Sequence, residues 1–514
     1  MADTYNAAAW LLDRNVLEGR GGSLALACRG ERHTYDAVLR DVWRAQNALR
    51  QLDVRPGERV AMVVNDEPAF VSWFLGSLRS GAVPVPLSTM LTPDELGAIV
   101  ADSGAGTVVL SEPYADHLAT LAKHAPDLRV AVVLGASGAD PVVSLHYWPD
   151  LDDTTEAPVA PTRADSPAFW LYTSGTTGSP KGAMHRHANP EATATTYARA
   201  VLRIEPGDRC LSVAKLFFAY GLGNSLTFPF SVGAAAILEP ERPTPLGMAA
   251  LLVAERPSLF FATPGFVAAI LDADVPVDAF ASVRLTITAG ESLPAPLHQR
   301  FRERFGHPVL DGIGSTEALH IFISNRDGEE RPGTSGTPVP GYEAKLLDEN
   351  DGDVTDADAP GFLHVRGPST ATGYWCRRDA THAAFRGDWL RTGDVYTRSA
   401  DGYYTFLGRN NDMIKAGGIW VSPAEVEAVI VEHPDVLEAA VVGARDDKGL
   451  ETTVAFVVPR SDRTIDAAVI DAHCRDRMAA FKRPRRIIAI AQLPKTPTGK
   501  IRRFALREQL AAET

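Results

Sequence analysis

The most informative stretch of this chain reads Thr173-Ser174-Gly175-Thr176-Thr177-Gly178-Ser179-Pro180-Lys181-Gly182 and follows directly after the apolar run 168–172. Its glycines let backbone N–H groups turn toward an anion, because no Cβ stands in the way. Its hydroxyl groups add hydrogen-bond donors, and Lys181 adds a positive charge on a flexible stem. A cluster of Ser, Thr and Gly alone is typical of a polar surface turn. The lysine and the motifs described below favour instead a loop that binds the phosphates of a nucleotide.

Two common nucleotide-binding motifs do not fit this loop. A P-loop requires Gly-x4-Gly-Lys-Ser/Thr, but the position of its second glycine, counted from Gly175, holds Pro180. The dinucleotide-binding fingerprint fails as well, because no glycine follows Gly221-Leu222-Gly223 at position 226. The loop therefore belongs to another class of phosphate-binding site.

Short apolar runs alternate with helical patterns on both sides of the loop. Thr92 is expected to cap a helix with Pro93 in its first turn, and Asn189 to cap another that begins at Pro190. This βαβ rhythm predicts an α/β fold with mostly parallel sheets, in which ligands collect at the C-terminal ends of the strands. Strands are predicted at 59–64, 82–87, 106–110, 283–289 and 309–311.

The pattern changes after residue 330. Short β-runs separated by turns, at 361–367 and 401–406, are typical of a small antiparallel barrel. A polar stretch, 408–412, then precedes a compact α+β pattern. Its expected helices and strands are 423–433, 436–442, 452–458, 464–480 and 485–491.

The length of 514 residues suggests two to four folding units. We expect a large N-terminal domain, residues 1–408, that combines two parallel-sheet subdomains with the small β-barrel. A small α+β C-terminal domain, residues 409–514, should follow it. The fold class is therefore α/β with an appended α+β domain.

Composition and charge also bear on the partners and the location that we expect for this protein. The net charge of −13 argues against nucleic acid as a partner, so any anion site must create its own local positive field. The most apolar long stretch, 211–238, contains Lys215 and Pro229 and is a poor membrane span. The N-terminus lacks the pattern of an export signal, so a cytoplasmic location is expected. The four cysteines form no CxxC motif, which favours a reduced compartment: Cys28, Cys210, Cys376 and Cys474.

Further motifs follow the loop in a fixed order. They read Asp311-Gly312-Ile313-Gly314-Ser315-Thr316-Glu317, Arg391-Thr392-Gly393-Asp394, Gly408-Arg409 and Lys495-Thr496-Pro497-Thr498-Gly499-Lys500. With the loop 173–182 they resemble the motifs of the adenylate-forming superfamily, which includes acyl- and aryl-CoA synthetases, peptide-synthetase adenylation domains and luciferases. The resemblance spans residues 50–505 and implies ATP and Mg²⁺ as cofactors, with CoA as a co-substrate.

The resemblance also implies roles in ATP binding. Asp394 would accept the ribose hydroxyls with Arg409 as a second clamp, and Glu317 would hold Mg²⁺ with Thr176 as a hydroxyl neighbour. Lys500 would bridge the acid and the α-phosphate, because two anions approach each other only when cations neutralise them. The implied ATP-binding residues are Thr173, Ser174, Gly175, Thr176, Thr177, Gly178, Lys181, Gly290, Glu291, Asp311, Gly312, Thr316, Asp394 and Arg409.

In this superfamily a thiol then attacks the acyl-adenylate, after the mobile C-terminal domain has rotated about a hinge. The resemblance places the hinge near 409–412, at Asn411, where many relatives have Asp or Lys. Asparagine tolerates unusual φ/ψ, so the rotation is expected to survive this departure. Lys415 would serve the rotated orientation. The implied catalytic residues are Lys500, Lys415, Thr176 and Glu317.

The resemblance extends to the CoA site. Gly417 and Gly418 would leave room for a narrow pantetheine arm. Phe481 would stack on the adenine of CoA, and Arg483 would pair with its 3′-phosphate. A hydrophobic plug beside a solvated run of charges is an equally good interpretation of this segment.

The acid pocket resembles that of benzoate–CoA ligases, on the runs 215–224 and 312–322. Ala219 replaces the aspartate that pairs with the ammonium group in amino-acid-activating relatives, which disfavours an amino acid substrate. His320 would pair with a ring hydroxyl or with the carboxylate, or would simply pack in the core. The residues expected to line a flat, mostly apolar slot are Ala219, Tyr220, Gly221, Ala289, Gly290, Ile313, Gly314 and His320.

We therefore expect an ATP-dependent aryl-acid:CoA ligase that acts on benzoate or a hydroxybenzoate such as salicylate. One alternative is a stand-alone aryl-acid adenylation enzyme that loads a carrier-protein thiol. Another is a non-catalytic module that binds a nucleotide or acyl-CoA. The expected partners are a small aromatic acid and CoA, with no nucleic acid and no membrane, and both a monomer and a homodimer stay open.

Overall fold

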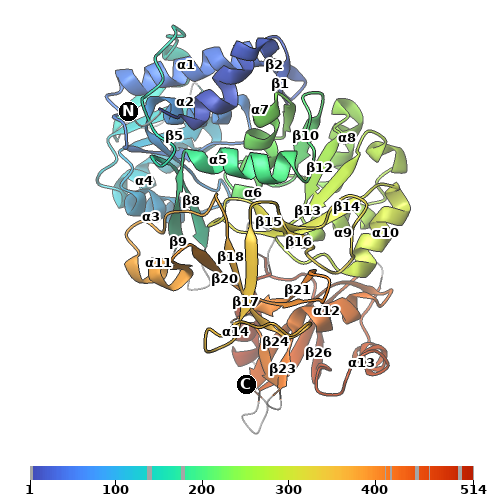
Figure 1. Cartoon of the computed structure of the whole chain (residues 1–514). Helices are drawn as coiled ribbons and strands as arrows, with labels where there is room; N and C mark the ends of the chain where they lie inside the picture. The colour runs from blue at the N-terminus through green and yellow to red at the C-terminus, as the bar shows by residue number, and fades with distance from the viewer. Residues whose placement is uncertain are drawn as a thin grey trace.

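Figure 1 shows the course of the chain in a computed structural model, which describes residues 4–135, 142–174, 180–410, 412–416, 419–445, 451–461, 463–495 and 501–512. Several of the expected site residues lie outside these ranges. They are Gly175, Thr176, Thr177, Gly178, Asn411, Gly417, Gly418 and Lys500. Ser174 and Lys415 are described only as members of their strands.

The first sheet has five strands in the order β4-β3-β5-β6-β7, and all its pairings are parallel. It confirms the three strands predicted before residue 111. The strands are β3 (Arg59–Val63), β4 (Val83–Pro86), β5 (Thr107–Ser111), β6 (Val130–Leu134) and β7 (Ser144–Tyr147). The helices of this region are α1 (Tyr35–Gln51), α2 (Pro68–Ser80), α3 (Pro93–Ser103) and α4 (Leu118–His124).

The start of α3 agrees with the prediction from the sequence. Thr92 Oγ1 accepts a hydrogen bond from Glu95 N at 3.3 Å, and the Glu95 carboxylate accepts one from Thr92 N at 2.8 Å. This capping box satisfies two backbone N–H groups in a region where the helix supplies no acceptor of its own.

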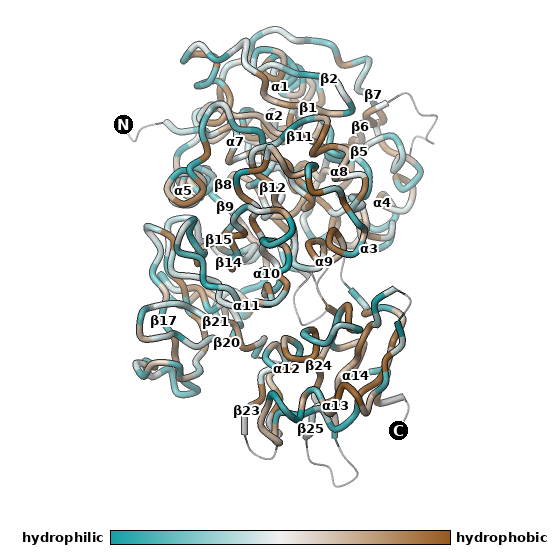
Figure 2. The backbone as a smooth tube through the Cα atoms, turned by 90° about the vertical axis from the view of Figure 1, so that its right-hand side faces the viewer, coloured by the Kyte–Doolittle hydropathy of each residue, from teal (hydrophilic) through white to brown (hydrophobic). Residues whose placement is uncertain are grey.

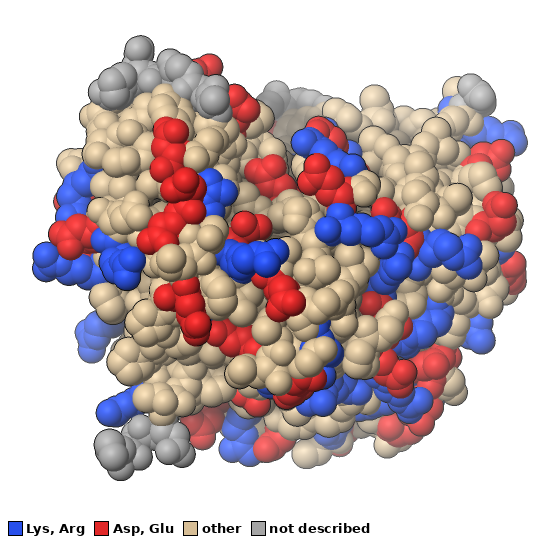
Figure 3. Space-filling view, turned by 90° about the horizontal axis from the view of Figure 1, so that it is seen from above, with Lys and Arg blue, Asp and Glu red and all other residues tan. Residues whose placement is uncertain are grey.

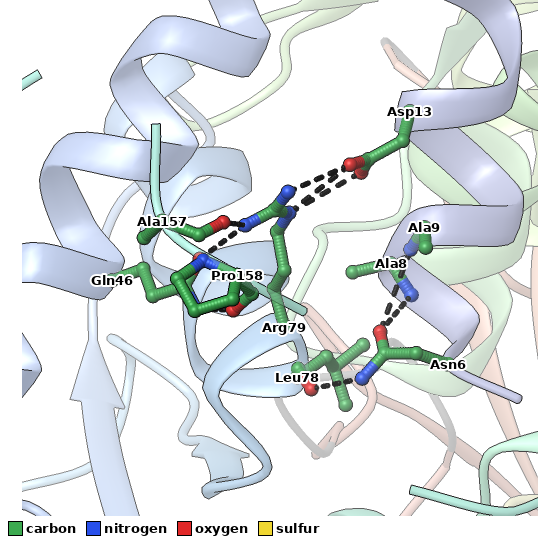
Figure 4. A network of polar contacts seen from close by, with 9 residues as sticks. All are labelled: Asn6, Ala8, Ala9, Asp13, Gln46, Leu78, Arg79, Ala157 and Pro158. Carbon is green, nitrogen blue, oxygen red and sulfur yellow. Dashed lines mark hydrogen bonds and ion pairs between the residues drawn. The ribbon is translucent and has the colours of Figure 1, made fainter. Parts of the chain in front are cut away.

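A buried arginine at the end of α2 joins the N-terminal segment to this region (Figure 4). The Arg79 side chain is only 3% exposed and forms an ion pair with Asp13 at 2.9 Å. It also donates to Gln46 Oε1 of α1 at 2.6 Å and to the Ala157 carbonyl. Three segments that are distant in the sequence are thus joined by one guanidinium, whose fork of donors suits several acceptors at once.

The second sheet has nine strands in the order β16-β15-β14-β13-β12-β10-β11-β1-β2, with a parallel centre and antiparallel pairs at both edges. Its strands are β1 (Leu24–Cys28), β2 (Glu31–Thr34), β10 (Arg209–Ser212), β11 (Ala235–Leu238), β12 (Leu259–Ala262), β13 (Leu285–Thr288), β14 (Val309–Gly314), β15 (Ile321–Ser324) and β16 (Thr337–Pro338). The helices α8 (Pro245–Glu255), α9 (Pro264–Asp272) and α10 (Ala295–Phe305) belong to this region.

β8 (Pro167–Ser174) and β9 (Pro180–Arg186) form an antiparallel hairpin. The two ends of the predicted phosphate loop 173–182 belong to these strands. A segment much later in the chain runs along β9, because Met184 N donates to the Gly373 carbonyl at 3.0 Å and Trp375 N to the Gly182 carbonyl at 2.9 Å. Phe74 of α2 packs on Phe169 of β8 with ring centroids 5.4 Å apart. The hairpin is therefore held between the first sheet and the segment 372–375.

The helix after β9 differs from the prediction. Asn189 does not cap it, because α5 (Ala188–Thr193) begins before it and continues as the π-helical segment η5 (Ala194–Arg199). The Asn189 side chain points instead to His185 and to the Ser369 carbonyl, at 2.9 and 2.8 Å. The Asn189 side chain thus forms tertiary hydrogen bonds, although its local propensity favours a helix cap.

The β-runs predicted for the barrel form an antiparallel sheet of β17 (Glu343–Leu347), β18 (Gly361–Arg366), β19 (Phe385–Arg386), β20 (Trp389–Arg398) and β21 (Tyr404–Arg409).

The last part of the chain lies at the lower end of the molecule in Figure 1 and has mixed α and β structure. It comprises β22 (Ile414–Ala416), β23 (Ile419–Val421), α12 (Pro423–Val431), β24 (Val436–Arg445), β25 (Glu451–Pro459), α13 (Ala467–Arg475), β26 (Arg486–Ala489) and α14 (Arg503–Ala512).

The helix predicted over 464–480 is shorter than expected. Asp466 caps α13 by accepting a hydrogen bond from Ala468 N at 2.9 Å, so the helix begins at Ala467. The side chain of an N-terminal aspartate competes for the first backbone N–H groups and so fixes where a helix begins.

Hydrophobic residues, drawn in brown, are concentrated on the strands, and hydrophilic residues, drawn in teal, on the outer loops (Figure 2). Basic and acidic side chains are interspersed on the face drawn in Figure 3, so the negative net charge does not form one acidic patch there. None of the helices that the structure describes is both long and apolar enough to cross a membrane.

Candidate active site

Glu317 lies in the loop that follows β14, and its carboxylate faces the segment that borders the hairpin. Tyr374 donates its hydroxyl to Glu317 Oε1 at 2.7 Å. Lys181 Nζ, at the start of β9, lies 5.5 Å from the centroid of the same tyrosine ring. The lysine of the predicted phosphate loop and the acid of the predicted metal motif are therefore brought together on Tyr374.

The backbone of the Glu317 loop is fixed from two sides. The Thr316 carbonyl accepts a hydrogen bond from His185 Nε2 at 2.9 Å, and the Glu317 carbonyl accepts one from Ala371 N at 2.7 Å. Leu319 adopts φ = +66°, a left-handed conformation that branched side chains rarely take. Such strain persists only where the surroundings fix the backbone, as is common around functional groups.

The Glu317 carboxylate suits a magnesium ion that is held mainly by phosphate oxygens. The described residues include no cluster of three or more His, Cys, Asp or Glu side chains that could form a complete metal cage. Magnesium seldom needs one, because it usually takes one or two protein carboxylates together with substrate phosphates and water. Glu317 therefore fits the role, while Thr176 lies outside the described residues.

Asp394 and Arg409 occupy paired positions on β20 and β21. Their side chains form an ion pair at 2.9 Å, and that of Asp394 is only 6% exposed. The carboxylate of Asp394 raises the pKa of Arg409. Arg409 also donates to the Thr392 carbonyl at 3.1 Å. The two residues expected to clamp the ribose therefore lie together as one charged pair.

Asp311 lies within β14, opposite Thr288 at the end of β13, and its carboxylate turns into the sheet. Asp311 Oδ1 accepts a hydrogen bond from Thr288 Oγ1 at 2.7 Å, and burial raises the pKa of Asp311 to about 7. Gly290, with φ = +96°, and Glu291 follow Ala289 directly, and no other group lies within 4 Å of a Cβ placed on Gly290. The space next to Gly290 is therefore open, whereas the Asp311 side chain is enclosed in the sheet.

The expected acid pocket centres on the short helix α6 (Ala219–Leu222). Tyr220 donates its hydroxyl to the Ile287 carbonyl of β13 at 3.1 Å, and its ring lies 5.4 Å from that of His320. Phe228 and Tyr197 also contact His320, at 4.3 and 5.6 Å between ring centroids. The predicted residues Tyr220 and His320 are thus neighbours in an aromatic environment.

The hydrogen bonds of His320 determine its tautomer. Its Nε2 atom faces two acceptors, Asn224 Oδ1 at 3.1 Å and the Tyr220 carbonyl at 3.3 Å, so Nε2 carries the hydrogen. Burial lowers the pKa of His320 to about 3, so the ring is neutral at pH 7. Its Nδ1 atom is buried and has no partner among the described residues. His320 therefore presents one unused acceptor.

Close backbone contacts explain two glycines of this pocket. A Cβ at Gly221 would lie 2.0 Å from the Lys215 carbonyl oxygen, and a Cβ at Gly314 would lie 2.6 Å from the His320 carbonyl oxygen. Both distances are far below van der Waals contact, so any side chain would displace α6 or the end of β14.

Two basic residues of the C-terminal part, Lys495 and Arg460, face the N-terminal part of the chain. Lys495 forms an ion pair with Glu438 at 2.5 Å, and both lie beside Gly265 of α9, as does Glu291. Arg460, after β25, pairs with Asp272 at the end of α9 at 2.6 Å. Lys495 and Glu438 thus lie near the loop that follows β13, while Lys500 is outside the described residues.

The residues expected to bind CoA lie on the surface of the last unit. Phe481 is 36% exposed, and Lys482 Nζ lies 5.9 Å from its ring and pairs with Glu425 at 2.8 Å. The Arg483 carbonyl accepts a hydrogen bond from Thr453, while its Nε atom is buried without a partner among the described residues. An exposed aromatic ring beside basic side chains is suited to stacking on a purine.

The sequence alone assigns no role to Tyr374 or to His185. Both act through contacts between segments that are far apart in the chain, so no local spacing reveals them. The run 369–375, rich in small residues before an aromatic pair, gave no sign that it would border β9.

With this geometry in place, the chain is identified as a member of the AMP-binding enzyme family. Residues 12–375 match the family described as AMP-binding enzyme, and residues 425–500 match the AMP-binding enzyme C-terminal domain. The resemblance to adenylate-forming enzymes is thereby confirmed.

Several individual proteins of this family resemble the chain over nearly its whole length. The chain is 42% identical to a benzoate–CoA ligase of Thauera aromatica over 510 residues, which cover 98% of this chain and 96% of the relative. A solved benzoate CoA ligase from Burkholderia xenovorans LB400 is 43% identical with a TM-score of 0.90, covering 98% of this chain and 100% of that one. An anthranilate CoA ligase in complex with anthranoyl-AMP is 37% identical with a TM-score of 0.93, covering 100% and 99%.

Proposed function

We propose that this protein is an ATP-dependent aryl-acid:CoA ligase that acts on benzoate or a hydroxybenzoate. In the first step, the carboxylate of the acid attacks the α-phosphorus of ATP, and pyrophosphate leaves. In the second step, the thiolate of CoA attacks the carbonyl of the aryl-AMP, and AMP leaves with the electron pair of the broken C–O bond.

The observation that carries this proposal is the convergence of Lys181 and Glu317 on Tyr374. Lys181, a cation from the hairpin of β8 and β9, and the carboxylate of Glu317 both lie next to this one aromatic residue, as a site for phosphates and Mg²⁺ requires. The first step joins two anions, so its site must supply positive charge to both the phosphates and the acid. When bound, Mg²⁺ would supply part of this charge, and Glu317 would hold it.

The remaining ATP contacts follow from the ion pair on β20 and β21. Asp394 accepts from the ribose hydroxyls, and Arg409 holds the carboxylate in place. Lys495, on the N-terminal side of Lys500, lies near Glu291. Lys500 keeps the role that the resemblance implies, as the cation between the acid and the α-phosphate.

The aromatic environment of Tyr220 and His320 favours a flat ring over a long acyl chain. The neutral His320 offers a lone pair at Nδ1, which accepts from a hydroxyl or amino group but repels a carboxylate oxygen. A hydroxyl group on the ring would therefore satisfy His320, and the carboxylate of the substrate would point away from it toward ATP.

Exchange of labelled pyrophosphate into ATP tests the first step. It should depend on an aromatic acid and be strongest in a panel of benzoate and its hydroxy derivatives. The thiol acceptor is tested separately, by product analysis with CoA and with a carrier-protein thiol. We expect aryl-CoA; exclusive loading of the carrier protein would indicate a stand-alone adenylation enzyme. No exchange with benzoate, hydroxybenzoates, aminobenzoates or fatty acids would refute the proposal.

A further inference from the structure

His185 connects the hairpin of β8 and β9 to the loop that follows β14 and contains Glu317. It lies on β9, is 1% exposed, and stacks on Phe169 of β8 with ring centroids 5.1 Å apart. Asn189 donates from Nδ2 to His185 Nδ1 at 2.9 Å, so the ring hydrogen is on Nε2. Nε2 then donates to the Thr316 carbonyl at 2.9 Å. Both ring nitrogens are used, and the tautomer is determined by the partners.

The bond to Thr316 bears directly on Glu317. The Thr316 carbonyl and the Glu317 nitrogen belong to the same planar peptide unit. A hydrogen bond at that carbonyl therefore fixes the plane from which the Glu317 side chain projects. Tyr374 fixes the other end of the side chain, by donating to Oε1 at 2.7 Å. The carboxylate is thus oriented at its base by His185 and at its tip by Tyr374.

We propose that His185 is a positioning residue that orients Glu317 toward the divalent cation accompanying ATP, an inference that rests on the function proposed above. Groups that orient the carboxylate or imidazole ligands of a metal usually contribute about 10- to 100-fold to metal affinity or activity. Complete burial lowers the pKa of His185 to about 4, so the ring keeps one protonation state at neutral pH.

His187 provides a matched control. It follows β9 by one residue, is 0% exposed, and burial lowers its pKa to about 4 as well. Its Nδ1 atom accepts from Ala7 N at 3.1 Å, in the N-terminal segment. Its Nε2 atom has no partner among the described residues, and none of its described hydrogen bonds reaches the Glu317 loop. Loss of His187 should therefore affect stability without affecting the cation.

The test compares His185→Phe, His185→Gln and His187→Phe with the natural protein. Calorimetry measures the affinity of a non-hydrolysable ATP analogue with Mg²⁺ and with a chelator. We expect His185→Phe to lose about 10- to 100-fold of the Mg²⁺-dependent affinity, while the affinity measured with chelator stays unchanged. His185→Gln keeps an N–H donor for Thr316 and should recover most of the loss. His187→Phe should lower the melting temperature but keep the full Mg²⁺ effect.

An unchanged Mg²⁺ effect in His185→Phe, or an equal loss in both Phe variants, would overturn the inference. If His185→Phe does not fold, Asn189→Ala takes its place, because it removes the donor that sets the tautomer; an unchanged Mg²⁺ effect there would count equally against us. The proposed function fails separately, when the natural protein shows no pyrophosphate exchange with any aromatic acid, because the binding measurement needs no acid.

Discussion

The Tyr374 hydroxyl contributes to the site through one contact, its hydrogen bond to Glu317. Its ring also lies beside Lys181, so this one residue neighbours both the cation of the predicted phosphate loop and the carboxylate expected to hold Mg²⁺. The carboxylate of Glu317 and burial together raise the pKa of Tyr374 well above its usual value, which keeps the hydroxyl protonated as a donor at all moderate pH values. Removal of the hydroxyl therefore isolates the orientation of Glu317.

Tyr374→Phe should lower the rate of adenylate formation about 10-fold and raise the Mg²⁺ concentration needed for half-maximal exchange, because the carboxylate loses its orienting donor. Pyrophosphate exchange at varied Mg²⁺ measures both effects. Tyr403→Phe is the control, since that exposed hydroxyl contacts the Glu329 carbonyl away from the site. A variant Tyr374→Phe with the natural Mg²⁺ dependence would contradict the assignment.

A second residue-scale prediction concerns His320. His320→Phe keeps an aromatic ring but removes the unused acceptor, so it should reduce the preference for hydroxybenzoate over benzoate by about 10-fold, the value of one hydrogen bond to a buried group. The ratio of kcat/KM for the best hydroxybenzoate and for benzoate measures this preference. An unchanged ratio would mean that His320 only packs against Phe228 and Tyr197.

At the scale of elements, the Arg79 network joins α1, α2 and the N-terminal segment (Figure 4). Asp13→Ala leaves a buried guanidinium without its counter-charge and should lower the free energy of unfolding by about 3–5 kcal/mol. Thermal unfolding measures the change. Glu343→Gln removes an exposed ion pair with Arg366 and should cost less than about 1 kcal/mol. Equal midpoints for the two variants would show that the Arg79 network adds no special stability.

Elements with local signals were predictable from the sequence. The Thr92 cap and the strands β3, β4 and β5 of the first sheet follow from side-chain chemistry within a few residues, while the glycines of the acid pocket were expected from the family resemblance. Asn189 shows where this reasoning ends. The same side chain can cap a helix or bind a distant partner, and the choice was made by His185 and Ser369. Tyr374 could not be found at all, because its segment reaches β9 only in the folded chain.

At the scale of the whole molecule, the pair Arg460–Asp272 joins the C-terminal unit to α9. The distance is 2.6 Å, and the two side chains are 20% and 24% exposed. Lys495 lies near Glu291 in this same arrangement. If the C-terminal unit rotates between the two steps, as the superfamily implies, we expect this pair to persist in the orientation that serves adenylation and to break in the other.

Arg460→Gln should therefore slow adenylate formation several-fold without slowing the transfer of a supplied aryl-AMP to CoA. Separate assays of the two half-reactions measure this difference. Arg463→Gln is the control, because Arg463 pairs with Asp435 inside the C-terminal unit at 3.6 Å. The exchanged pair Arg460→Asp with Asp272→Arg should restore adenylation. Equal loss in both half-reactions would show that the pair stabilises the fold rather than one orientation.

The strand-like segment beside β9 has a consequence for synthesis on the ribosome. Thr372 donates to the Met184 carbonyl across 188 residues of sequence. At translation rates of about 5–20 residues per second, the segment 372–375 is synthesised on the order of 10–40 s after the hairpin of β8 and β9. During that interval a nascent chain exposes one edge of β9 and lacks the tyrosine that orients Glu317. We therefore expect nucleotide with Mg²⁺ to stabilise the emerging chain less before the segment 372–375 has left the exit tunnel than after it.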